Sequence, residues 1–289
     1  MSRSPSDPRH AERPIERGDS RASSGPTVPM ERLTIGRSPE REPVQHRGRT
    51  YRLSHEDART LATLGTFRVV RADDLQPMTS SRGAWTGHLR HLREQGLMDV
   101  KTVTINRQPV AVAVLTSDGK SLLEAHQDRS AGRPVQVFHA GLVKPRELAH
   151  DAQLFRLFQA EAARIEGDGG RVARVVLDYE LKRDYQTFLN RPSRAHDGED
   201  VSTFAAAHQL RVIDGHVELP DLRIEYETAD AALTYRDVEL VTEHYSRAQL
   251  AGKAAAGFSM YRAAGARRSG GAARTGGTPV DPHHLEWLG

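Results

Sequence analysis

The chain has 289 residues, of which 37% are hydrophobic, and it contains no cysteine. This length predicts more than one module, and the absence of cysteine excludes disulfides, thiolate nucleophiles and zinc sites built from cysteine. The 41 basic and 38 acidic side chains leave a net charge of +3, which permits nucleic-acid binding without requiring it. Because no apolar run is long enough to span a bilayer and the N-terminus is polar, we expect a cytoplasmic protein without a membrane partner.

Both ends of the chain have the composition of unstructured segments. Residues 1–48 mix Arg, Pro, Ser and Glu with almost no apolar periodicity, so we expect a disordered tail and a fold that starts near Tyr51. Residues 264–289 include the run RRSGGAARTGG, which predicts a flexible glycine-rich tail followed by a short C-terminal segment.

Residues 50–127 have the order of elements expected of a winged helix. Ser54 and Asp57 form a capping box at the start of the first helix, which Gly65 ends. The other expected elements are a short helix over 72–75, a helix capped by Ser80 or Ser81 that ends at Gly96, strands over 97–105 and 110–116, and a helix that starts at Ser117. This order is typical of DNA-binding winged helices, although the same module also serves as a protein-interaction domain.

The third expected helix separates apolar from basic side chains. Trp85, Leu89 and Leu92 lie on one face of a helical projection. The opposite face carries the candidate DNA-binding residues Arg82, Thr86, Arg90 and Arg93. Arg107, in the predicted turn between the two strands, is a further candidate, because arginine pairs readily with phosphate.

Residues 135–263 predict a second, α/β module with a mixed sheet. Its expected elements are a helix over 147–165, a central strand over 172–179, helices over 182–189 and 200–210, strands over 211–213, 217–226 and 237–241, and a helix over 246–261. The order of helix, strand, insertion, strand, strand and helix is that of a restriction-endonuclease-like core. The expected fold class is therefore a two-domain α+β or α/β protein.

Acidic residues near the ends of two expected strands could form a catalytic site. Asp221 and Glu239 are candidate ligands for Mg²⁺ or Mn²⁺, because hard cations prefer oxygen ligands. In this fold a lysine usually follows two residues after the second acid, but that position is Val241. We expect Lys253 on the next helix to supply the charge instead, which makes Asp221, Glu239 and Lys253 the candidate catalytic set.

Other polar residues compete for a place in this site or could join it. The alternative acids are Glu225, Asp237 and Glu243. His150, Asp151 and Glu161 could reach the site from the helix over 147–165, or they could form an ordinary polar helix face. Asp178, Glu180 and Lys182 alternate along the expected central strand, so they could converge on the same cleft or be exposed.

Several short motifs together resemble one protein family. They are His150-Asp151, VVLDYELKRDY (175–185), PDLRIEYE (220–227), VELVTEHY (238–245) and AGKAAAGFSMY (251–261). In order and spacing, residues 50–262 resemble the replication-relaxation proteins of bacterial mobile elements and plasmids. The resemblance implies a cytoplasmic, DNA-associated role in replication or mobilisation, with an endonuclease-like second domain. Many members carry an acid-x-acid pair where this chain has Glu239-Leu240-Val241, and no last strand is evident after Tyr261, which favours a binding role.

Three functions follow as expectations. The first is a DNA-binding accessory protein of plasmid or mobile-element replication or mobilisation, whose nuclease-like domain is degenerate or regulated. Its partners would be double-stranded DNA and replication or mobilisation proteins. The second is a metal-dependent endonuclease that uses Asp221, Glu239 and Lys253. The third is a non-catalytic scaffold whose winged helix binds protein.

Overall fold

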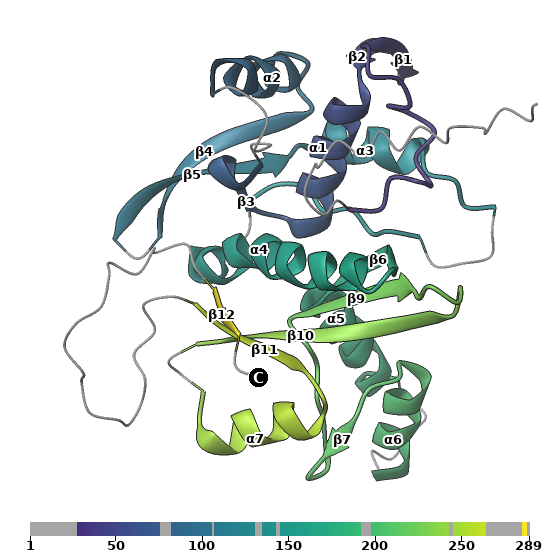
Figure 1. Cartoon of the computed structure of the whole chain (residues 1–289), viewed down its shortest axis with the longest axis vertical. Coiled ribbons are helices and arrows are strands. Elements are labelled where there is room, and N and C mark those ends of the chain that lie inside the picture. The colour runs from purple at the N-terminus through teal and green to yellow at the C-terminus, as the bar shows by residue number, and fades with distance from the viewer. Residues whose placement is uncertain are drawn as a thin grey trace, which may run out of the picture.

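The chain folds into a mixed α+β structure (Figure 1). The computed structural model describes residues 28–75, 82–105, 107–130, 135–142, 145–191, 198–242, 245–263 and 285–287. The largest cluster of buried hydrophobic side chains extends from Val28 to Tyr261 and includes residues of both expected modules, while smaller clusters lie beside it. Within the described residues, no helix has the length and hydropathy needed to cross a membrane.

The N-terminal part combines helices with two small antiparallel sheets. Its elements are β1 (Glu42–His46), β2 (Arg49–Leu53), α1 (His55–Phe67), β3 (Val70–Arg71), the 3₁₀ helix η1 (Ala72–Leu75), α2 (Arg82–Glu94), β4 (Met98–Ile105), β5 (Gln108–Leu115) and α3 (Ser117–Ala125). β1 and β2 form a hairpin, and the second sheet has the order β3-β5-β4. The expected helices and strands of residues 50–127 are therefore present within one or two residues of their predicted ends, and the predicted caps Ser80 and Ser81 lie outside the described residues.

The start of α1 shows how local sequence fixes this part of the fold. Ser54 accepts a hydrogen bond from the main-chain N–H of Asp57, and the Asp57 carboxylate accepts one from Ser54, which confirms the predicted capping box. Leu61, Leu64 and Phe67 are fully buried along the same helix. α1 is thus capped at its N-terminus and stabilised by the burial of its apolar side.

Residues 28–48 belong to the folded core, which corrects the prediction of a disordered tail up to residue 48. Val28, Leu33, Ile35 and Val44 are buried in the main hydrophobic cluster, and β1 pairs with β2 along its whole length. The apolar side chains spread over this segment are too few to form a core of their own. They are stabilised because they pack on a core that other elements provide. Residues 1–27 lie outside the described part of the chain.

The C-terminal part is built on a mixed sheet. Its elements are α4 (Pro145–Gly167), β6 (Arg171–Leu177), α5 (Asp178–Leu189), α6 (Gly198–Ala207), β7 (Val212–Ile213), β8 (His216–Val217), β9 (Leu222–Glu227), β10 (Leu233–Val241), α7 (Arg247–Ala255), β11 (Ser259–Ala263) and β12 (Leu285–Trp287). The sheet order is β12-β11-β10-β9-β6, in which β10 and β11 are parallel and the other neighbours antiparallel. β7 and β8 form a separate small hairpin.

Helix α4 lies between the two parts of the molecule. It contacts α1 and β3 on one side and strands β6, β9 and β10 on the other, as its central place in Figure 1 shows. The ring of Phe67 at the end of α1 lies 5.3 Å from that of Phe155 and 5.2 Å from that of Phe158, both on α4. Because these rings are buried together, α4 holds the N-terminal part against the sheet.

The chain beyond α7 differs from the prediction. The helix expected to reach Tyr261 ends at Ala255, because Gly257 adopts a left-handed conformation (φ +84°) that terminates it. The next residues form β11, which pairs in parallel with β10. This is the final strand of the core that was not evident from the sequence. In the predicted flexible tail, the described residues 285–287 form β12, where Trp287 lies opposite Tyr261.

Two further boundaries move residues that matter for the candidate site. β6 ends at Leu177, so Asp178, Glu180 and Lys182 lie in the first turns of α5 and do not alternate along a strand as predicted. The strand expected over 217–226 is split into β8 and β9, and Asp221 comes directly before β9. The main-chain N–H of Asp178 donates to the carbonyl of Asp221 (3.0 Å), which fixes the start of α5 beside that acid.

Candidate functional site

Helix α2 presents a polar, solvent-facing side. Thr86, Arg90 and Arg93 are exposed on it. Apart from the adjacent residues and the backbone of the helix itself, no atom lies within 4 Å of the place that a Cβ would occupy at Gly83 or Gly87, so the surface next to these arginines is open. Of the predicted apolar face, Trp85 and Leu92 are buried and Leu89 is partly buried. The division between the two faces of this helix is therefore as predicted.

The two remaining candidate DNA contacts lie at other places. Arg82 is the first residue of α2, and its side chain lies outside the described part of the structure. Arg107 is exposed in the turn between β4 and β5, with φ at +65°. The structure brings Thr86, Arg90 and Arg93 together on one helix and places Arg107 at the tip of the neighbouring hairpin.

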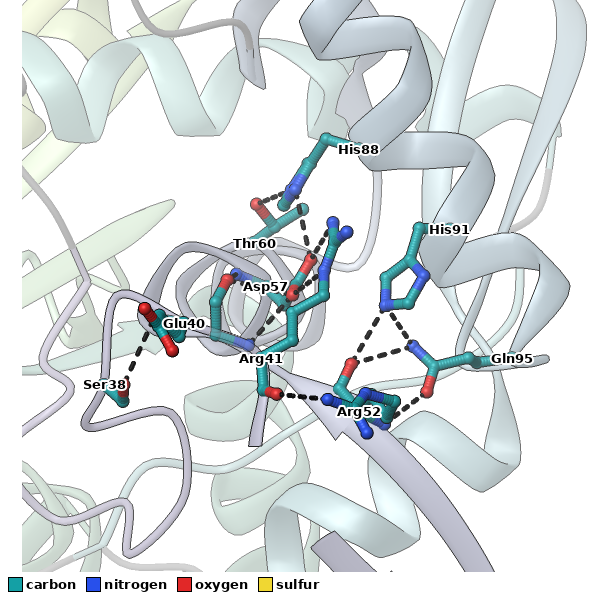
Figure 2. A network of polar contacts seen from close by, with 10 residues as sticks. Ser38, Glu40, Arg41, Arg52, Asp57, Thr60, His88, His91 and Gln95 are labelled. Atoms are coloured by element: carbon teal, nitrogen blue, oxygen red, sulfur yellow. Dashed lines mark hydrogen bonds and ion pairs between the residues drawn. The ribbon is translucent and has the colours of Figure 1, made fainter. Parts of the chain in front are cut away.

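A buried polar network fixes the other side of α2 to α1 (Figure 2). Asp57 of α1 is fully buried; its carboxylate accepts a hydrogen bond from Nε of Arg41 at 2.9 Å and lies 3.1 Å from Nδ1 of His88 on α2. Nε2 of His88 lies 3.0 Å from the hydroxyl of Thr60. Burial disfavours the charged carboxylate, but the hydrogen bonds from His88, Arg41 and Ser54 outweigh it and hold the pKa of Asp57 well below its ordinary value.

A second set of contacts fixes α2 to the N-terminal hairpin. The carbonyl of Arg52 on β2 lies 2.9 Å from Nε2 of His91 and accepts a hydrogen bond from the amide of Gln95 at 3.2 Å. The main-chain N–H of Arg52 donates to Oε1 of Gln95 at 2.6 Å, as Figure 2 shows. Sequence reasoning did not find these partners, because no strand was predicted directly after the segment 1–48 that was expected to be a disordered tail. Together the two networks fix α2 to α1 and β2, and Arg90 and Arg93 face the solvent.

The register of the sheet brings the predicted acids of the second part together. Leu177 on β6 and Val238 on β10 both lie opposite Leu222 on β9. Asp221, directly before Leu222, therefore adjoins Glu239, directly after Val238. The main-chain N–H of Asp221 donates to Oε2 of Glu239 (3.2 Å), and Oδ2 of Asp221 accepts from the N–H of Leu240 (2.9 Å).

Lys253 completes the predicted set from α7. Its Nζ lies 3.2 Å from Oε1 of Glu239 and 3.4 Å from Oε2 of Glu218, and it donates to the carbonyl of Leu219 at 2.6 Å. The hydroxyl of Tyr245 donates to the same Oε1 of Glu239 at 2.5 Å. The structure thus places Asp221, Glu239 and Lys253 in one cluster, and adds Glu218 and Tyr245, which sequence reasoning missed.

His150 on α4 joins the cluster from the other side. Its Nε2 lies 3.1 Å from Oδ1 of Asp221, and its Nδ1 lies 3.3 Å from Oδ1 of Asp151. Arg68, which follows α1, lies 3.3 Å from the other carboxylate oxygen of Asp151. Both His150 and Asp151 were named from the sequence as residues that could reach the site, whereas Arg68 was not.

The charges of this cluster are closely coupled. Burial disfavours the imidazolium of His150, but its contacts with Asp151 and Asp221 outweigh this and raise the pKa of His150 to about 10. Burial also opposes the charge of Asp221, yet His150 beside it lowers the pKa of that carboxyl. Burial and the negative charge of Asp221 raise the pKa of Glu239 to about 7, against the opposing effects of Lys253 and Tyr245. Each acid therefore has a cation of the chain beside it.

The carboxylate oxygens of the pair already have partners from the chain. Those of Asp221 face His150 and the N–H of Leu240, and those of Glu239 face Lys253, Tyr245 and the N–H of Asp221. Among the residues that the structure describes, no group of three or more His, Asp or Glu side chains is arranged to hold a metal ion. A divalent cation would have to displace His150 or Lys253, so this arrangement does not fit a metal centre as it stands.

The alternative acids are engaged elsewhere. Glu225 and Asp237 pair with arginines of the sheet. Glu161 is fully buried and accepts a hydrogen bond from Arg236 at 2.9 Å. Glu243 lies outside the described residues. The structure therefore leaves Asp221 and Glu239 as the acidic pair of the candidate site.

The cluster reaches solvent through a cleft of about 460 Å³ whose lining includes His150 and Asp221. His150 is half-buried, whereas Asp221 and Glu239 are buried, so a ligand would approach from the side of His150.

Comparisons of the chain with family models, with curated proteins and with solved structures found no match. These residues and their geometry are therefore the basis for a proposed function.

Proposed function

We propose that this protein binds double-stranded DNA through α2 and acts as an accessory protein in the replication or mobilisation of a plasmid or other mobile element. The observation that carries the proposal is the exposed face of α2, where Arg90 and Arg93 lie beside open glycines on a helix fixed from behind. Arginine suits this role because its guanidinium forms paired hydrogen bonds with phosphate oxygens. The assignment to mobile elements comes from the resemblance to replication-relaxation proteins.

The arrangement around α2 supports its interpretation as the recognition helix of a winged helix. α1, η1 and α2 come first, β4 and β5 form the hairpin that follows, and β3 adds the third strand. In such modules the helix before the hairpin enters the major groove, and the hairpin turn contacts the backbone nearby. Arg107 at that turn would then contact a phosphate beside the site of α2.

A binding assay with matched variants tests this function. We expect the double variant Arg90→Ala/Arg93→Ala to bind a fluorescein-labelled duplex at least tenfold more weakly than the wild type, because it lacks two charge-assisted hydrogen bonds to phosphate, each worth about 1 kcal/mol or more. The variant Arg211→Ala/Arg247→Ala removes the same charge from exposed positions on the C-terminal part and should bind like the wild type. Equal affinity of all three proteins would favour the protein-interaction scaffold.

For the C-terminal part we propose a restriction-endonuclease-like domain that is degenerate or regulated. Its support is the mixed sheet, with Asp221 directly before β9, Glu239 on the neighbouring strand β10 and Lys253 beside Glu239. Because His150 and Lys253 already lie against the two carboxylates, the pair is not open to a metal ion in this arrangement, which supports a degenerate or regulated domain.

A metal-dependent endonuclease is the second candidate. The convergence of Asp221, Glu239 and Lys253 favours it, since the two acids would hold Mg²⁺ or Mn²⁺ and the lysine would lie near the phosphate under attack. A bound cation would stabilise the charge on that phosphate, but only after His150 or Lys253 had moved.

A further inference from the structure

The cleft next to the acidic cluster lies where the N-terminal part meets α4 and α5. It has a volume of about 460 Å³. Side chains that can bind a nucleotide line it, namely Arg68, His150, Tyr179, Lys182, Arg183 and Gln186, together with the carboxylates of Glu147, Asp151, Asp178 and Asp221. Each of these carboxylates lies beside a cation of the same lining. The cleft thus combines an aromatic ring, several cations and the open side of the candidate site, which are the features that a nucleic-acid strand requires.

Tyr179 offers a stacking surface at this cleft. It is the second residue of α5 and is 44% exposed, although large aromatic side chains are usually buried. The guanidinium of Arg68 lies 5.0 Å from the centre of its ring, and the ring of His139 meets it edge-on at 5.7 Å. These two contacts hold the ring in place, so a base that stacks on its exposed part has little ordering cost to overcome.

Cations lie within one turn of this ring. The side chains of Lys182 and Arg183 are 59% and 53% exposed. They pair with Asp178 and Asp184 on the same helix, at 2.5 and 3.2 Å. The pair of Arg183 and Asp184 is exposed and contributes little free energy, so a phosphate can compete for Arg183. Asp178 is only 19% exposed, but the ammonium group of Lys182 has three donors and can contact a phosphate while it stays paired. Aromatic stacking beside a line of cations is the usual way in which proteins bind single strands without sequence preference.

We propose that this cleft binds an unpaired nucleotide of a DNA strand, with the base on Tyr179 and the flanking phosphates at Lys182 and Arg183. This inference rests on the proposed DNA-binding function and extends it, because it gives the C-terminal part a ligand of its own. His150 and Asp221 at the end of the cleft then face the bound strand. The protein would hold a duplex at α2 and an opened strand beside α5.

Binding of a short labelled oligothymidylate to the full chain, followed by fluorescence anisotropy, tests the proposal. Tyr179→Ala should weaken binding about fivefold or more, because the base can no longer stack on an aromatic ring. Tyr179→Phe keeps the ring and should bind like the wild type. Lys182→Gln/Arg183→Gln should reduce the dependence of log K on log salt by about 0.7 for each phosphate that is no longer neutralised. Unchanged affinity in Tyr179→Ala would overturn the proposal.

The same variants separate this inference from the proposed function. Arg90→Ala/Arg93→Ala should lose duplex binding and keep its affinity for oligothymidylate, while Tyr179→Ala should show the reverse pattern. If Tyr179→Ala binds both ligands normally and the α2 variant loses the duplex, the cleft is not a binding site and the function of α2 stands. If only Tyr179→Ala shows a loss, the cleft stands and the proposed role of α2 fails.

Discussion

Nδ1 of His88 lies 3.1 Å from Oδ1 of the buried Asp57, and this contact joins α2 to α1. The same carboxylate accepts hydrogen bonds from Arg41 and from the start of its own helix. One side chain thus caps α1 and positions the helix that we propose contacts DNA. Such a double role makes Asp57 the most informative position for testing how the surface of α2 is held.

Replacing Asp57 should destabilise the protein strongly. We expect Asp57→Ala to lower the free energy of unfolding by about 3–5 kcal/mol, because it removes one partner of a buried, hydrogen-bonded charge. Asp118→Ala removes an exposed carboxylate that pairs with Arg49 at 3.2 Å and should cost less than about 1 kcal/mol. Urea denaturation followed by circular dichroism measures both. Similar losses in the two variants would show that the network around Asp57 is not important for stability.

The same carboxylate predicts a dependence of stability on acid. The folded pKa of Asp57 is depressed, so its contribution is complete above the unfolded pKa of about 3.9 and is lost as the pH falls below that value. The free energy of unfolding should therefore fall more steeply between about pH 5 and pH 3 in the wild type than in Asp57→Asn. Parallel pH curves for the two proteins would contradict this assignment.

The sequence predicted one half of the role of Asp57 and not the other. Its place three residues after Ser54 identified the capping box, since that pattern is local. Its contact with His88 could not be predicted, because the approach of α2 to α1 depends on packing between distant segments. The same limit applies to the contact between His150 and Asp221, where the residue types were identified but not their partnership.

Residues 28–48 should contribute measurably to stability. Leu33 is 3% exposed, and we expect Leu33→Ala to cost about 2–4 kcal/mol through reduced burial and the cavity left behind. Leu233 is 57% exposed, and Leu233→Ala should stay within about 0.5 kcal/mol of the wild type. Thermal or urea unfolding compares the two variants. An effect at Leu33 no larger than that at Leu233 would restore the view that this segment is a tail.

The amino-acid composition of residues 28–48 misled the prediction, because it records how few apolar side chains the segment has and not what those side chains pack against. Val28, Leu33, Ile35 and Val44 show neither helical nor strand periodicity, yet each packs on a core made by other elements.

At the other end of the chain, Gly257 was the signal in the sequence for the end of α7, and the short strand β11 after it forms by pairing with β10. The acidic pair was predictable because Asp221 and Glu239 lie near the ends of two strands that the apolar pattern predicts, and the pairing of Leu222 with Val238 places them side by side.

Divalent cations should have little effect on the folded protein. His150 and Lys253 already face the carboxylates of Asp221 and Glu239, so we expect Mg²⁺ or Mn²⁺ to leave the melting temperature of the wild type unchanged. Differential scanning fluorimetry with and without each ion measures this, with Asp221→Asn as the matched variant. A metal-dependent rise in the wild type that disappears in Asp221→Asn would favour the endonuclease instead.

The salt dependence of duplex binding tests the central claim, that Arg90 and Arg93 on α2 contact DNA phosphates, most directly. Affinities of the wild type, of Arg90→Ala/Arg93→Ala and of Arg211→Ala/Arg247→Ala should be measured over a series of KCl concentrations. The slope of log K against log salt should be shallower by about 1.8 in the α2 variant, which is about 0.9 for each phosphate that an arginine no longer neutralises, and unchanged in the control. Equal slopes and equal affinities in all three proteins would contradict the claim.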